Sequence, residues 1–77
     1  MMTIYADKYR QIGLKIAYYR KLRGMTQEQL AEKLELSPAF IGHVEAPNVN
    51  KAVSLDTLFD VAAALDVPPY KFLQFDE

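Results

Sequence analysis

Residues 26–45 read TQEQLAEKLELSPAFIGHVE, and this stretch decides the fold. Its apolar spacing predicts two helices of about eight residues each, at Gln27–Leu34 and Pro38–Glu45, joined by a turn of three or four residues. Ala31 is small enough to let the second helix pack closely on the first. The stretch therefore predicts a tight pair of short helices.

Both helices carry start signals. Thr26 and Gln29 have the spacing of a capping box, in which each side chain pairs with an otherwise unsatisfied backbone amide. Ser37 followed by Pro38 is a second signal, because serine caps a helix and proline at its first position loses no needed N–H. Each start is therefore specified locally.

Helical patterns continue on both sides of this stretch. Upstream, Ile12, Ile16 and Tyr19 predict a helix from about Asp7 to Arg23, which Gly24 ends. Downstream, residues 46–53 lack periodicity and form a loop. Ser54 then caps a fourth helix that runs to Leu65, and Pro68 and Pro69 begin a last short helix with Phe72 and Leu73. No segment alternates like a strand, so we expect an all-α fold of five helices.

Length and composition bound the architecture. The chain has 77 residues, of which 51% are hydrophobic and 25% charged, so it has a globular balance and room for one core. We expect residues 12–77 to form a single domain and residues 1–11 to be an N-terminal extension that continues into the first helix. The absence of cysteine and of a long apolar run favours a cytoplasmic protein without a membrane span.

The charges are distributed unevenly along the chain. Residues 1–33 hold seven Lys and Arg against three Asp and Glu, and residues 34–77 hold two against seven, although the net charge is only −1. Such separation can present a basic face to an anionic partner. The alternative is chance segregation of solvated charges. Both interpretations apply to Arg10, Lys15, Arg20, Lys21, Arg23 and Lys33.

Signals for catalysis or a bound cofactor are weak. One histidine, no cysteine and no glycine-rich phosphate loop exclude the commoner triads, metal clusters and nucleotide sites. Glu28, Glu32 and Glu35 lie about one helical turn apart, but such a row is mostly solvated charge. We expect neither an enzyme, nor a metal site, nor a cofactor.

The chain resembles the phage-repressor and Cro-like (XRE) helix-turn-helix family over residues 12–73. The resemblance lies in Gln27, Leu30, Ala31, Leu34, Leu36, Ser37, Ile41, Val44 and Glu45, in Gly13, Ile16, Tyr19 and Arg20 upstream, and in the run from Ser54 to Leu65. It implies a compact helical domain whose third helix enters the major groove of DNA while the second crosses the backbone.

The resemblance also implies a DNA-binding surface and a structural ion pair. In that surface Gln27 and the start of the second helix match the family's phosphate clamp, and the outer side of the third helix matches its base-reading positions. The DNA-binding residues would be Thr26, Gln27, Ser37, Pro38, Ala39, Phe40, Gly42, His43, Asn48, Asn50 and Lys51. The implied ion pair joins Arg20 to Glu45 in a buried link between the first and third helices.

Several positions depart from the family pattern. On the outer side of the third helix only His43 can hydrogen-bond a base edge, whereas Ala39 and Phe40 suit thymine methyl groups. Each of His43, Phe40 and Gly42 has a second interpretation. His43 is then an exposed histidine without a role, Phe40 packs on the second helix, and Gly42 is a glycine that the helix simply tolerates. Glu35 replaces the usual turn glycine at a position that tends to need positive φ.

The expected function is sequence-specific binding of duplex DNA by a small transcriptional regulator, most simply a repressor. A phage regulator, a restriction-modification controller and an antitoxin all remain open. A protein-interaction module on the same scaffold is the alternative from another class, which the negative net charge and the weakly polar third helix support. Three further aromatic residues, Phe59, Tyr70 and Phe75, favour a two-fold homodimer on a palindromic operator, and the alternative is a monomer.

Overall fold

The structure is a computed structural model that describes residues 4–47 and 52–75. Its elements follow one another as α1 (Ala6–Leu22), α2 (Gln27–Leu34), α3 (Pro38–Glu45), α4 (Leu55–Leu65) and the short 3-10 helix η1 (Pro69–Phe72). All regular elements within these described ranges are helical, which confirms the all-α expectation.

The starts of α2, α3 and α4 form as their sequences predict. The Thr26 hydroxyl accepts a hydrogen bond from the Gln29 backbone N–H at 3.0 Å, and the Gln29 side chain accepts one from the Thr26 N–H at 2.8 Å. Ser37 accepts from the Phe40 N–H, and Ser54 accepts from the Thr57 N–H, each at 3.1 Å. Each cap satisfies an amide that the helix itself leaves without a partner.

Two helices end in a residue with left-handed backbone conformation. Glu35 follows α2 with φ 57° and ψ 39°, as expected for the position where glycine is usual in the family. Asp66 follows α4 with φ 56°, which the sequence did not reveal. An ordinary side chain in this conformation costs about 1 kcal/mol, so the tertiary contacts beyond each residue must offset that cost.

The expectation of a fifth helix is not confirmed beyond a single short 3-10 helix. Residues 69–72 instead form one 3-10 turn, held by bonds from the Lys71 N–H to the Pro68 carbonyl and from the Leu73 N–H to the Tyr70 carbonyl. Two adjacent prolines lack N–H groups, and the fully buried Phe72 turns into the core within four residues. The segment is therefore too short to establish the longer-range bonds of an α-helix.

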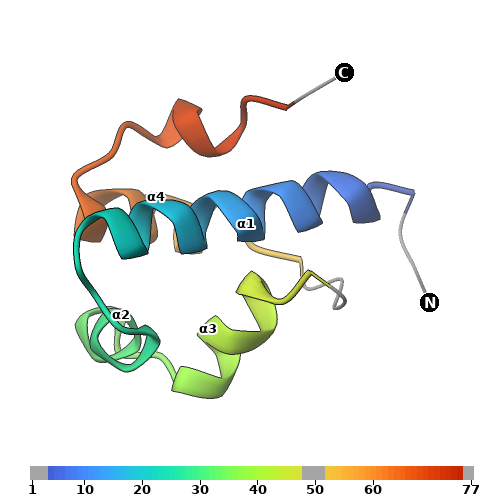
Figure 1. The fold of residues 1–77 in the computed structure, drawn as a ribbon. Coiled ribbons are helices and arrows are strands. Elements are labelled where there is room, and N and C mark those ends of the chain that lie inside the picture. Colours follow the sequence, from blue (N-terminus) through green and yellow to red (C-terminus); the bar gives the residue numbers. More distant parts are fainter. Residues whose placement is uncertain (1–3, 48–51, 76–77) are drawn as a thin grey trace.

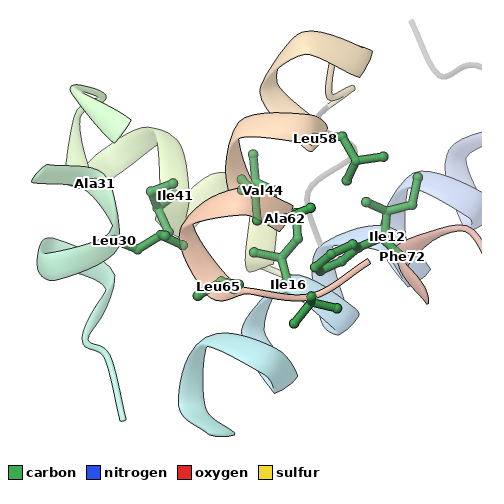
Figure 2. Close-up of a cluster of buried hydrophobic side chains, with 12 residues drawn as sticks. Ile12, Ile16, Leu30, Ala31, Ile41, Val44, Leu58, Ala62, Leu65 and Phe72 are labelled. Carbon is green, nitrogen blue, oxygen red and sulfur yellow. The ribbon is translucent and has the colours of Figure 1, made fainter. Parts of the chain in front are cut away.

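One hydrophobic cluster joins all the elements. Figure 2 shows side chains from α1, α2, α3, α4 and η1 meeting in it. The core consists of Ile12, Ile16, Leu30, Ala31, Ile41, Val44, Leu58, Val61, Ala62, Leu65, Val67 and Phe72. Because each helix contributes only a few of these side chains, no helix buries an apolar face without the others.

The helices form two groups around this core. Figure 1 shows α4 behind α1 and the η1 segment running along one side of α1, while α2 and α3 lie together on the opposite side. Contacts of α3 with α1 and of α2 with α4 join the two groups. The arrangement leaves the side of α3 that faces away from α1 and α2 at the surface.

Two aromatic residues near the ends of the chain pack onto the core. Phe75 is half-buried, with the ammonium groups of Lys8 and Lys15 at 4.8 Å and 6.0 Å from its ring centre. Phe75, which was counted among the aromatic residues favouring a dimer, thus packs against the chain's own core beside α1. Tyr9 also packs against the core along α1, whereas Ile4 and Tyr5 are exposed.

Candidate nucleic-acid interface

Helices α2 and α3 meet across the short connection Glu35–Ser37. Leu30 and Ala31 of α2 have no exposed surface, and Ile41 of α3 has 1%. The methyl side chain of Ala31 leaves room for α3, which is why a small residue suits this position. The pair has the architecture of a helix-turn-helix unit.

The exposed side of α3 is small and mostly apolar. Pro38, Ala39 and His43 are exposed, and Gly42 is half-buried among them. Phe40 is half-buried and packs against the core. A flat surface with one imidazole can approach DNA closely, but it offers few donors and acceptors to base edges.

The other residues of the expected surface lie at the helix starts and in the loop after α3. Thr26 and Ser37 are exposed, and their hydroxyls accept the cap hydrogen bonds. Asn48, Asn50 and Lys51 lie outside the described residues. The Gln27 side-chain oxygen lies 3.7 Å from where a β-carbon on Gly42 would be, so the start of α2 and the middle of α3 are neighbours.

A buried ion pair links α1 to the end of α3. The Arg20 guanidinium donates from Nε to Glu45 Oε2 at 2.7 Å and from Nη2 to Oε1 at 2.9 Å, and its Nη1 donates to the Met25 carbonyl at 2.6 Å. Arg20 and Glu45 are only 6% and 7% exposed. The hydrogen bonds to Glu45 raise the pKa of Arg20 above its ordinary value.

Gln27 joins the same carboxylate, which sequence reasoning missed. Its Nε2 donates to Glu45 Oε1 at 2.9 Å, so one oxygen of Glu45 accepts from both α1 and α2. Gln27 was expected to contact phosphate with its amide, but here the amide links the start of α2 to the end of α3. No local signal reveals this contact because 18 residues separate the partners.

Most of the basic side chains in residues 1–33 interact within the fold. Arg23 donates to the carbonyls of Leu65 and Asp66 at 2.7 Å and 3.0 Å, and so caps the end of α4. Arg10 pairs with Asp7 along α1, and hydrogen bonds from Arg10 and Gln11 lower the pKa of Asp7 below its usual value. Arg10, Arg20 and Arg23 thus all have partners within the fold.

Residues 4–47 and 52–75 contain neither a metal-binding cluster nor a membrane-spanning helix. No three histidine, cysteine or carboxylate side chains there come together as a metal site, and the glutamates of α2 form no such group. No helix in the same ranges is both long enough and apolar enough to cross a bilayer.

Comparisons with known proteins agree with this architecture. Residues 16–72 match a family model described as helix-turn-helix. Over 56 residues the chain is 43% identical to an immunity repressor protein of Bacillus phage phi105, an overlap that covers 73% of this chain and 38% of the relative. The chain thus spans well under half the length of that relative.

Two solved structures share the fold. A crystal structure of SinR, a master regulator for biofilm formation, in complex with DNA has a TM-score of 0.75 and 33% identity, covering 82% of this chain and 98% of that one. The restriction-modification controller protein C.AhdI from Aeromonas hydrophila has a TM-score of 0.81 and 27% identity, covering 91% and 99%. Together with the family model, which spans most of the core, these likenesses show that the chain belongs to the XRE-type helix-turn-helix family.

Proposed function

We propose that this chain binds duplex DNA sequence-specifically and regulates transcription as a repressor. The observation that carries the proposal is the α2–α3 unit. Its second helix, α3, which we call the recognition helix, keeps one side at the surface while its other side packs in the core. An exposed helix of this width fits the major groove, where base edges carry a distinct donor and acceptor code. The phage immunity repressor and the DNA-bound SinR structure support the same role.

In this proposal the expected surface residues divide between two tasks. His43 supplies the hydrogen bond to a base edge, and Ala39 contacts a thymine methyl group. Thr26 and Gln27 lie beside the phosphate backbone at the start of α2, where the helix dipole favours anions. Residues 12–77 act as the DNA-binding domain, and the chain works in the cytoplasm.

An electrophoretic shift assay tests the proposal directly. At low salt the protein should retard even random duplex, because non-specific binding rests on phosphates alone. Selection from a random DNA pool should then enrich one sequence. Failure to retard any duplex at 50 mM salt or below would contradict DNA binding and favour the protein-interaction module on the same scaffold.

We further propose that the chain forms a two-fold homodimer through an apolar surface of α4 and η1. Phe59 is 49% exposed and Tyr70 is 58% exposed, and Leu55 and Leu73 are exposed beside them. Burial of these side chains would favour association, since apolar area gains about 25 cal/mol per Å² when it leaves water. A two-fold dimer places two recognition helices about 34–36 Å apart, which matches a palindromic operator.

Light scattering at micromolar concentration tests the dimer. The wild type should have the mass of two chains, and Phe59→Asp should have the mass of one. Tyr18→Asp is the control, because Tyr18 is 60% exposed on α1, outside the proposed surface. A wild-type mass of one chain, with and without DNA, would exclude the dimer.

A further inference from the structure

Few of the described basic side chains near the proposed DNA surface are without a partner in the fold. The exposed side of α3 carries no lysine or arginine. Arg20 and Arg23 hold Glu45 and the end of α4, and Arg10 is paired with Asp7. A protein that binds DNA must nevertheless neutralise phosphates with cations. DNA binding therefore requires another basic side chain close to α3.

A groove beside α3 contains such a side chain. It runs between α1 and the α2–α3 unit, and α1 contributes Leu14, Ala17 and Lys21 to its walls. The opposite walls include Gln27 and Gly42, two residues of the expected DNA surface. Lys21 is exposed. The groove therefore places Lys21, in the last turn of α1, next to the start of α2 and the middle of α3.

The other lysines in the described part of the chain lie elsewhere. Lys33 lines a separate groove with Glu35 of the turn and Asp60 of α4. Lys8 and Lys15 lie over the Phe75 ring, and Lys71 is half-buried in η1. Among the described lysines, Lys21 is the one that borders the same groove as Gln27 and Gly42.

The chemistry of the groove suits one strand of a DNA backbone. Glu45 also lines it, but this carboxylate is nearly buried and its charge is balanced by Arg20 at 2.7 Å. Leu14, Ala17 and Pro47 give the walls an apolar part against which a deoxyribose can pack. The exposed cation then supplies the attraction for the phosphate itself.

We propose that this groove is a phosphodiester-binding site in which Lys21 of α1 contacts a backbone phosphate of duplex DNA while α3 lies in the major groove. The inference rests on the proposed DNA binding and adds α1 to the interface. The contact carries no sequence information, so it acts equally on every duplex.

Lys21→Gln tests the site, with Lys33→Gln as the matched control. Both changes remove one positive charge from an exposed lysine, so any effect of net charge is the same in the two variants. Affinity for a selected duplex and for a random duplex is measured between 50 and 200 mM salt, and melting temperatures establish that both variants fold. Each phosphate contact contributes about 0.9 to the slope of log affinity against log salt, which is about a threefold change over this range.

The proposal expects Lys21→Gln to reduce the salt slope by about one contact and to weaken binding to both duplexes by the same factor. Lys33→Gln should keep the wild-type slope. A second pair places a carboxylate on the groove wall with Ala17→Glu, or at an exposed position of α1 outside the groove with Tyr18→Glu, and only the first should lose DNA affinity. Equal slopes and equal affinities within each pair would overturn the site alone, whereas a wild type that binds no duplex would overturn the proposed function and this site with it.

Discussion

Gly13 of α1 lies directly against the backbone of Val44 in α3, so closely that a β-carbon on residue 13 would fall 1.9 Å from the Val44 carbonyl oxygen. No side chain fits in that space, and the obstacle is a backbone atom rather than a flexible side chain. The closeness of α1 to the end of the recognition helix therefore depends on the absence of one methyl group.

Gly13→Ala should destabilise the protein by about 1–3 kcal/mol or more, because α1 and α3 must separate to admit the methyl group. Gly42→Ala is the control: its β-carbon meets only the Gln27 side-chain oxygen at 3.7 Å, an ordinary contact. In that variant the better helix propensity of alanine should add about 0.5–1 kcal/mol. Urea denaturation measures both values, and equal stabilities of the two variants would contradict this view of Gly13.

Arg20→Ala should lower stability by about 3–5 kcal/mol, since it leaves the carboxylate of Glu45 buried without its counter-charge. Arg10→Ala provides the comparison on the same helix. Arg10 pairs with Asp7 in an exposed position, and such pairs contribute about 0–1 kcal/mol. Thermal unfolding of both variants measures the difference. If Arg20→Ala lowered the melting temperature no more than Arg10→Ala does, the structural role of the buried pair would be contradicted.

Asp7 should make stability depend on acid pH. Its folded pKa is lowered from 3.8, mainly by the hydrogen bond from Arg10 and then by that from Gln11. A depressed carboxyl pKa stabilises the folded state above the unfolded pKa, and this contribution disappears as pH falls through the folded value. The advantage of the wild type over Asp7→Asn should therefore shrink below pH 3.8, and a constant difference between melting curves from pH 7 to pH 2 would contradict the shift.

His43→Ala should weaken binding to the selected site by about 1–3 kcal/mol, and the protein should lose its preference at a single base pair of that site. Binding to random duplex should stay unchanged. The reason is that His43 is the exposed hydrogen-bonding side chain within α3. Asp60→Ala, at an exposed position of α4, should alter neither value. Unchanged affinity and unchanged base preference in His43→Ala would remove His43 from the base contacts.

The features that follow from the sequence are local in the chain. Thr26, Ser37 and Ser54 announce helix starts because each side chain pairs with an amide three residues later. The positive φ of Glu35 could be expected because the family resemblance identifies the turn position. The outward direction of Ala39 and His43 follows from helical spacing once Ile41 and Val44 are assigned to the core.

The features that the sequence did not reveal depend on contacts between distant segments. Arg23 meets Leu65 across 42 residues, and nothing near either residue announces the cap. Gln27 could be placed at the start of α2, but its contact with Glu45 depends on how α2 and α3 cross. The sequence marks the start of a helix at Pro69, because proline is favoured at the first helical position. It does not show that the segment ends after one 3-10 turn at Phe72.

The shared carboxylate of Glu45 has a consequence for how the protein can change its target. Arg20 from α1 and Gln27 from α2 both donate to it, so the three helices are fixed to one another before any ligand arrives. A pre-organised recognition helix loses little conformational entropy on docking. Residues on its outer side take no part in this network, so Ala39 and His43 can be exchanged during evolution while the scaffold keeps its geometry. New sequence preferences can then arise by substitution at the surface alone.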